Sequence, residues 1–228
     1  QATISSAAVA ALVLAASPAL AQVTADDVWA SQGALYAAFG ITQTGTLARD
    51  GNTVTVSGAG GIYALPFDAG QVSWQSGDYT YTEENGEVSV GIGPAMTFSL
   101  SVDITLGTRV HATMQATLAA DALTRRFAGT PDAMVVTTIA DRLWIEATDL
   151  TFDGIPEMRD ALVNALIVAE GVDYRTEVRG TGPVTLIQQG TTARLITDMM
   201  FAADGIESRD VSEYLDSTFS ATTVLPRG

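Results

Sequence analysis

Three residue types that often carry chemistry are absent or nearly absent from this chain. It contains no cysteine and no lysine, and His111 is its only histidine. Without cysteine the chain has no disulfide, no thiolate metal ligand and no cysteine nucleophile. Without lysine it has no Walker A loop, no Schiff base and no Ser-Lys dyad.

Basic residues of every kind are scarce. The chain has 26 acidic residues against 11 arginines, which gives a formal net charge of -15. Nucleic-acid binding requires a clustered basic surface, so we exclude nucleic acid as a partner, and anionic membrane surfaces are disfavoured for the same reason. Hydrophobic residues make up 47% of the chain. This content is enough for a core, so the acidic composition does not indicate disorder.

The first 21 residues have the features of a cleavable signal peptide. Residues 7–16 are all apolar or small, and Ala19-Leu20-Ala21 matches the small-x-small pattern that signal peptidase cuts. The apolar run is shorter than the roughly 20 residues that a membrane-spanning helix needs. We therefore expect one exported domain over residues 22–228, without a transmembrane span, in the periplasm or outside a Gram-negative cell. Because no Met and no basic residue precede the apolar run, we expect the precursor to begin before Gln1.

An amphipathic helix is predicted directly after the cleavage site. Thr24 and Asp27 have the spacing of a capping box, and Gly40 suits the position after a helix end. Apolar residues recur between them at helical spacing: Val28, Leu35 and Phe39. We predict a helix from Ala25 to Phe39 that packs on the core, because its polar face lacks the basic residues of membrane-surface helices.

The chain then changes to strand periodicity. Asp50-Gly51 and Asn85-Gly86 each lie between alternating segments and predict two tight hairpins. The longest alternation covers residues 96–106 and repeats over 109–118, with Gly107-Thr108 as the turn between them. Its apolar positions are Met96, Phe98, Leu100, Val102 and Ile104, then Val110, Ala112, Met114, Ala116 and Leu118. Such strands have one buried face and one solvated face.

Further strands and a second helix are predicted in the carboxyl-terminal half. The strands cover residues 133–139, 143–150, 172–178, 184–188 and 194–202. A helix is predicted from Pro156 to Glu170, because proline suits the first helical position and Gly171 follows as a stop. Its expected apolar stripe is Met158, Leu162, Ala165, Leu166 and Ala169. Residues 210–219 fit either a short helix or an edge strand, and we expect the domain to continue beyond Gly228.

No catalytic, cofactor-binding or metal-binding residue can be assigned. His111 lies on the polar face of a predicted strand, and no Gly-x-Ser-x-Gly elbow accompanies it, so we interpret it as a solvated strand histidine. A zinc site around it would need carboxylates as all its other ligands. The sequence Gly58-Ala59-Gly60-Gly61 lacks the last glycine of a dinucleotide fingerprint and indicates a turn or a bulge.

Two groups of side chains leave alternatives open. Carboxylates lie close in sequence in two sets: Asp149, Asp153, Glu157 and Asp160, and Asp204, Glu207 and Asp210. A hydrolase needs two carboxylates that face each other across a cleft, whereas capping of the second helix explains the first set more simply, and neither set has EF-hand spacing. Five aromatic residues fit either a glycan-stacking platform or core packing, which we favour: Trp29, Trp74, Trp144, Tyr79 and Tyr81.

Three stretches resemble an alphaproteobacterial family, domain of unknown function DUF2125. They are the helix over residues 23–39, the strand segment Thr46–Gly58 and the segment Asp173–Val184. The resemblance covers most of the mature chain. It implies an exported envelope protein of uncharacterised role and supplies no site residues.

The expected architecture is a mainly β (α+β) domain, a long curved antiparallel sheet of hairpins with two packed α-helices. Two helices are too few to cover the apolar face of so many long strands. We therefore favour a non-enzymatic binding or structural module whose apolar face forms a core or a groove for a lipid or another amphiphile. The alternative is a carboxylate-based hydrolase or a glycan-binding β domain.

Overall fold

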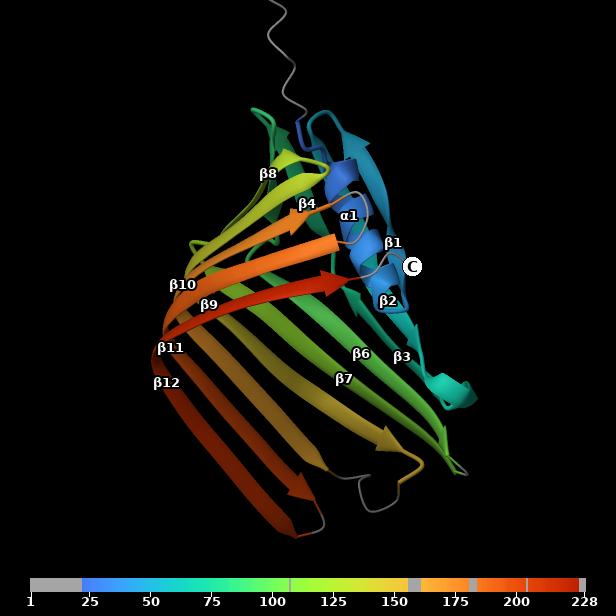
Figure 1. The fold of residues 1–228 in the computed structure, drawn as a ribbon. Helices are drawn as coiled ribbons and strands as arrows, with labels where there is room; N and C mark the ends of the chain where they lie inside the picture. Colours follow the sequence, from blue (N-terminus) through green and yellow to red (C-terminus); the bar gives the residue numbers. More distant parts are fainter. Residues whose placement is uncertain (1–21, 107, 156–160, 181–183, 204, 226–228) are drawn as a thin grey trace, which may run out of the picture.

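The computed structural model describes residues 22–106, 108–155, 161–180, 184–203 and 205–225 (Figure 1). The predicted signal peptide, the turn at Gly107 and the predicted start of the second helix lie outside these residues. The helix α1 spans Ala25–Ala38, and a short 3-10 turn covers Pro66–Asp68. The strands are β1 Ile41–Asp50, β2 Thr53–Ala64, β3 Gly70–Ser76, β4 Tyr79–Glu84, β5 Glu87–Gly91, β6 Ala95–Leu106, β7 Thr108–Asp121, β8 Thr124–Thr130, β9 Ala133–Asp153, β10 Leu162–Arg179, β11 Val184–Ala203 and β12 Ile206–Leu225.

These twelve strands form one antiparallel sheet, and its connectivity is that of a meander of long, bent strands. β3 and β4 pair with different parts of β2, and β7 and β8 pair with different parts of β9. Likewise β6 pairs with β3 and β7, while β5 pairs with β4 and β8. Each of the pairs β3–β4, β5–β6 and β7–β8 therefore acts as one strand interrupted at a bend. The predicted long curved antiparallel sheet of hairpins is confirmed.

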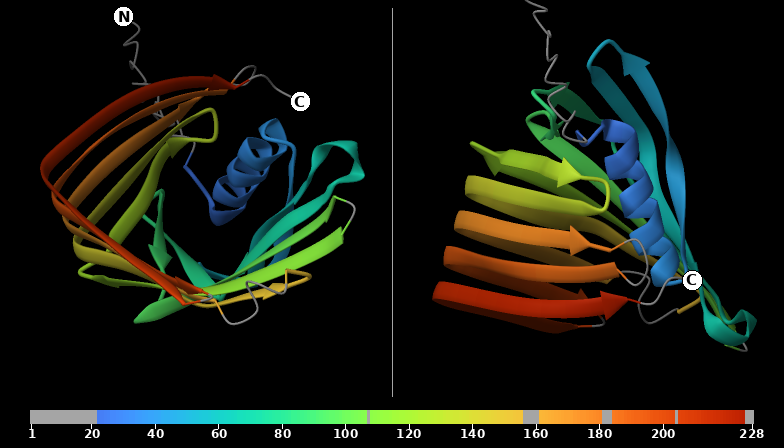
Figure 2. Two further views of the ribbon diagram at one scale, coloured as in Figure 1. Left: turned by 90° about the horizontal axis from the view of Figure 1, so that it is seen from below. Right: turned by 45° about the horizontal axis from the view of Figure 1, so that its top comes forward.

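The bends of neighbouring strands line up as a corner that folds the sheet into two halves (Figures 1 and 2). The upper half contains β4, β5, β8 and the parts of the longer strands paired with them, and the lower half contains β3, β6, β7 and their partners. Three corner residues have a left-handed backbone, namely Ala122 (φ 53°), Gly171 (φ 62°) and Asp216 (φ 47°). Figure 2 shows that the folded sheet curves around α1, which lies on its concave side.

The alternation of side chains changes phase at this corner. A small hydrophobic cluster spans the corner and contains Ala140 and Val172 from the upper half with Leu143, Ala169 and Leu195 from the lower half. Even-numbered residues of β9 and β10 therefore face the concave side above the corner, and odd-numbered residues face it below. The register between β9 and β10 is the same on both sides of the corner.

Helix α1 is anchored in the upper half. The predicted capping box is present, with Asp27 N donating to Thr24 Oγ1 at 3.2 Å and Thr24 N donating to Asp27 Oδ2 at 3.0 Å. Ala25 and Val28 are buried in the main core. Eight core residues come from the strands and three from α1 and the segment before it: Val54, Val56, Ala59, Tyr81, Val88, Phe127, Met134 and Val136, then Val23, Ala25 and Val28. Toward its end the helix is only half-buried, and Phe39 is 51% exposed.

The predicted helix from Pro156 to Glu170 is wrong. Residues 162–170 form the first part of β10, which pairs with β9 on one side and β11 on the other, so the described residues contain one α-helix rather than two. Leu162 to Ala169 form an almost continuous apolar run, and such a run does not distinguish an interior strand from a helix by its period. Gly171 does not stop a helix but lies at the corner of a strand.

Other local predictions are confirmed. Gly51 (φ 60°) and the pair Asn85 and Gly86 (φ 53° and 82°) form the two hairpin turns. The glycine-rich segment at Gly58 lies at a bulge, because Thr44 pairs with Gly60 while Thr46 pairs with Ser57. Residues 210–219 belong to β12, so the edge-strand alternative is correct.

Candidate functional site

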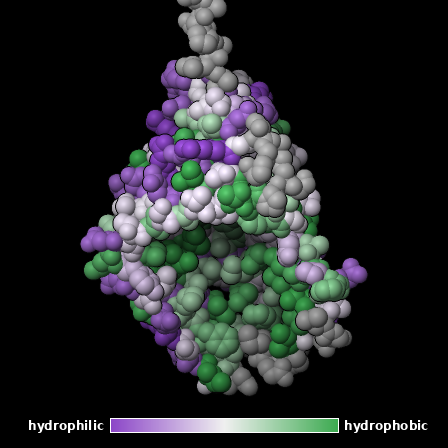
Figure 3. Space-filling view, in the orientation of Figure 1, coloured by the Kyte–Doolittle hydropathy of each residue, from purple (hydrophilic) through white to green (hydrophobic). Residues whose placement is uncertain are grey.

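The concave side of the sheet encloses an apolar hollow that opens toward the viewer in Figure 3. Its orientation follows from Trp74 of β3, whose ring contacts Tyr36 of α1 edge to face with centroids 5.7 Å apart. Leu100 pairs with Trp74, and Met114 pairs with Leu100, so both share this concave face. The apolar positions of the predicted alternation therefore line the hollow, and their polar neighbours form the convex surface.

The floor of the hollow can be followed across five strands of the lower half. One row of paired residues is Phe98, Ala116, Ala147, Ala165 and Met199. The next row is Met96, Leu118, Ile145, Ile167 and Thr197. Alanines occupy the middle of the first row, and two of them, Ala116 and Ala165, are only half-buried.

Several side chains of this floor remain in contact with solvent. Ile167 is 39% exposed, Met199 is 54% exposed and Tyr214, which pairs with Leu195, is 54% exposed. Helix α1 makes its main contacts with β1 and β4 rather than with the five strands of the floor. The lower half therefore presents apolar surface inside the fold without burying it fully.

Polar side chains mark the upper end of the hollow. Arg125 of β8 shares the concave face with Phe127, because Arg125 pairs with Thr138 and Phe127 pairs with the core residue Val136. The Arg125 guanidinium carbon lies 5.6 Å from the centroid of the Phe127 ring. It is exposed to the hollow, yet the protein surrounding the hollow desolvates it, and this lowers the pKa of Arg125. The group remains a cation, since an arginine side chain keeps its proton in proteins.

Two tyrosines lie beside this arginine. The Tyr79 and Tyr81 hydroxyl oxygens are 3.4 Å apart, and burial raises the pKa of both phenols. Tyr81 also contacts Phe127 edge to face at 6.4 Å between centroids. The upper end of the hollow thus combines one cation with neutral hydroxyls in an apolar surround.

His111 lies on the convex, polar face, as the alternation predicts. Its Nδ1 is 2.9 Å from Asp103 Oδ1, and this hydrogen bond, with the nearby Arg109, lowers the pKa of Asp103. The structure places two threonines, Thr113 and Thr151, in the neighbouring row, where their hydroxyls are 2.7 Å apart. The group is a solvated, hydrogen-bonded cluster across β6 and β7.

Of the carboxylates considered for hydrolysis, the described ones lie on two separate strands. Asp149 and Asp153 lie in β9, while Glu207 and Asp210 lie in β12, three strands away. Glu157, Asp160 and Asp204 lie outside the described residues. Among the residues that the structure describes, no group of three or more His, Asp or Glu could hold a metal ion.

The five aromatic residues considered for glycan stacking are divided between the two faces of the sheet. Trp29, Tyr79 and Tyr81 pack in or against the main core, and Trp74 contacts α1. Trp144 pairs with Ala119 on the convex side, where the Arg142 guanidinium carbon lies 5.1 Å from its ring centroid. They do not form one platform.

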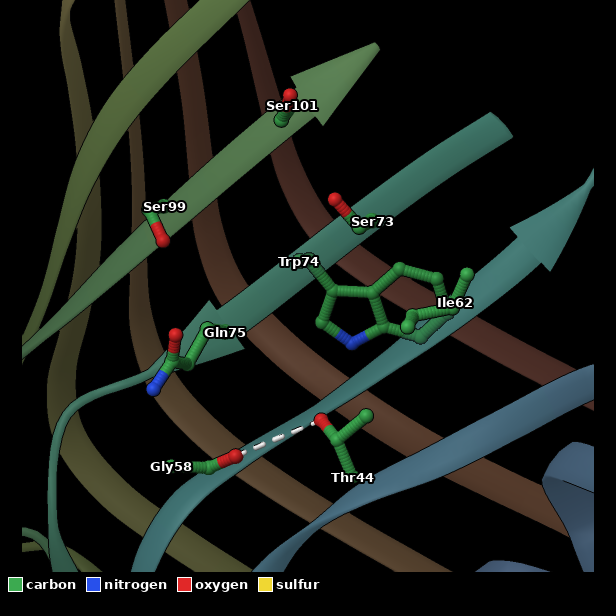
Figure 4. A pocket seen from close by; sticks show the side chains of 8 residues that line it. All are labelled: Thr44, Gly58, Ile62, Ser73, Trp74, Gln75, Ser99 and Ser101. Carbon is green, nitrogen blue, oxygen red and sulfur yellow. Dashed lines mark hydrogen bonds between the residues drawn. The ribbon is translucent and has the colours of Figure 1, made fainter. Parts of the chain in front are cut away.

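A shallow depression also involves strands β1, β2, β3 and β6 (Figure 4). Its lining includes the neutral polar residues Thr44, Ser73, Gln75, Ser99 and Ser101, and Thr44 Oγ1 donates to the carbonyl oxygen of Gly58 at 3.5 Å. Its lining residues include no titratable side chain. It therefore offers hydrogen-bond donors and acceptors, but its lining has no general acid or base that could activate a serine hydroxyl.

No family model, curated protein or solved structure matches the chain. The resemblance to DUF2125 therefore stays a prediction. In the part of the chain that the structure describes, α1 is too short to cross a membrane.

The residue that sequence analysis missed is Arg125. The only signal for it in the sequence is the alternation Leu123, Arg125, Phe127. An arginine there shares a strand face with two apolar residues. The hollow itself depends on the corner, which no local pattern indicated.

Proposed function

We propose that the concave hollow binds the hydrocarbon part of a lipid or another amphiphile and that the protein acts as a non-enzymatic binding module of the cell envelope. The observation that supports this most strongly is the apolar floor that α1 leaves uncovered (Figure 3). Contiguous exposed apolar surface is unusual on a soluble domain unless it binds something. Each methylene group transferred from water to such a surface contributes about 0.8 kcal/mol.

The polarity of the two faces supports the same function. Residues such as Asp198 and Arg209 form ion pairs on the convex side, with Arg209 Nε 2.9 Å from Asp198 Oδ1. Such ion pairs hydrate part of the convex face, while the row of apolar residues on the concave face can hold a hydrophobic ligand. Proteins that enclose small apolar ligands commonly have a preformed hollow with a few polar groups at one end.

The test compares two adjacent methionines of β11. Met199 faces the hollow opposite Ala165, and Met200 faces outward opposite Asn164. Met199→Asp places a charge on the hydrocarbon path and should lower lipid binding at least about tenfold. Met200→Asp is the matched control and should bind as the wild type does.

The measurement is native mass spectrometry of purified protein after incubation with a total lipid extract. Wild type and Met200→Asp should retain lipid masses, and Met199→Asp should lose them. A wild-type protein that retains no lipid would refute the proposal. A dimer that closes the hollow, measured by light scattering, would also contradict it, because a second copy would then cover the apolar floor.

A further inference from the structure

Two charged residues of opposite sign lie at opposite ends of the hollow and favour one orientation of a bound ligand. Arg125 lies on the concave face at the upper end, as described above. Asp210 of β12 pairs with Met199 and therefore shares the concave face at the opposite rim, on the outermost strand. A ligand along the hollow thus meets a cation at one end and a carboxylate at the other.

Within the described part of the chain, Arg125 differs from most arginines in having no carboxylate oxygen within 4.0 Å. Of the nine arginines in the described residues, seven lie within 4.0 Å of a carboxylate oxygen: Arg49, Arg109, Arg126, Arg175, Arg179, Arg194 and Arg209. The exceptions are Arg125 and Arg142, and Arg142 lies over Trp144 on the convex side. With 26 acidic residues in the chain, an unpaired guanidinium inside the hollow leaves its hydrogen-bond donors free for a ligand.

The distance from Arg125 to the apolar floor suits one acyl chain. The concave face runs from Arg125 through Leu123 and the corner to Leu118 on the same bent strand. Seven residues at about 3.3 Å each span at most roughly 23 Å. One acyl chain occupies about half of the 30 Å hydrocarbon core of a bilayer, or roughly 15 Å.

We propose that the hollow binds an acyl lipid with an anionic headgroup, a carboxylate or a phosphate, held by the Arg125 guanidinium while its chain lies on the floor of the lower half. This inference rests on the proposed function and adds the charge and the orientation of the ligand. The planar fork of arginine fits carboxylate and phosphate oxygens in pairs, and the apolar surround strengthens the contact. The net charge of -15 disfavours anions at the outer surface, so an anionic ligand is bound inside the hollow.

The experiment measures the binding of radiolabelled oleate and oleyl alcohol, which have the same chain and differ in headgroup charge. Wild type should prefer oleate. Arg125→Gln should weaken oleate binding about 10- to 100-fold and leave oleyl alcohol unchanged, because a charge-assisted contact is lost. Arg125→Lys should retain part of the preference. Arg142→Gln removes the other unpaired arginine and should match the wild type.

The outcomes separate this inference from the proposed function. If wild type binds neither ligand, both the proposed function and the inference fail. If wild type binds both equally, or if Arg125→Gln weakens both equally, the hollow still binds lipid but the role of Arg125 is overturned. Displacement of oleate by inorganic phosphate alone would overturn the acyl-lipid assignment, since it would identify a site for small anions.

Discussion

Gly171 at the corner of β10 offers a sharp test of how the sheet folds over. Its φ of +62° lies in the left-handed region, and a Cβ added there would lie 2.9 Å from the Cβ of Ala193 on β11. Gly171→Ala should therefore incur two costs. The left-handed backbone costs an alanine about 1 kcal/mol, and the crowding adds about 1–3 kcal/mol. We expect the free energy of unfolding to fall by about 2–4 kcal/mol, taking the two costs together.

The hairpin glycine Gly51 provides the control. Its φ is +60°, and a Cβ there meets nothing within 4 Å, so Gly51→Ala should incur only the backbone cost of about 1 kcal/mol. Urea unfolding followed by circular dichroism gives both values, with the slope as a check on two-state behaviour. In the double variant Gly171→Ala with Ala193→Gly, the crowding part should disappear, which a double-mutant cycle measures. Equal losses for Gly171→Ala and Gly51→Ala would refute the contact between β10 and β11 at the corner.

Two further predictions concern the attachment of α1. Thr24→Ala removes the cap and should lower the free energy of unfolding by about 1 kcal/mol in the same urea assay, and a change below the error would contradict the capping geometry. Glu83 accepts hydrogen bonds from Arg49 (Nη1 to Oε2, 2.7 Å) and from Ala25 N (2.7 Å), and the Arg49 contact in particular holds the pKa of Glu83 below its ordinary value of 4.5. A carboxylate whose pKa is lowered in the folded state stabilises the fold fully above its unfolded-state pKa, and this stabilisation is lost as the pH falls through the lower folded-state pKa. Glu83→Gln should therefore make the free energy of unfolding less dependent on pH below about 4.5, which urea unfolding at a series of pH values measures.

Much of the fold could be predicted because successive side chains of a strand point to opposite faces, so a buried face shows in the sequence as every second residue being apolar. The alternation over 96–106 and 109–118 predicted two strands and identified which side chains share the concave face. Asn85-Gly86 and Asp50-Gly51 predicted the hairpins, since few other pairs adopt left-handed turns cheaply. The cap at Thr24 predicted the start of α1.

The corner could not be predicted, because it arises from contacts between strands. Separate strands were predicted over 133–139 and 143–150, and over 184–188 and 194–202, where the structure has the single strands β9 and β11. The predicted gaps lie where the alternation changes phase. At the bend the alternation of apolar and polar residues changes phase, although the hydrogen-bonded strand continues. The sequence pattern therefore predicts two strands where the structure has one.

The sequence by itself determined that this chain is acidic, lacks cysteine and lysine, and builds long two-faced strands after a capped helix. Those properties depend on residue chemistry and on spacing along the chain. Tertiary structure alone decided that residues 162–170 form a strand, because pairing with β9 and β11 on both sides outweighs local helix preference. It also decided that the apolar faces curve around a hollow with Arg125 inside it, since only the folded corner brings β8 above the floor formed by β6, β7, β9, β10 and β11.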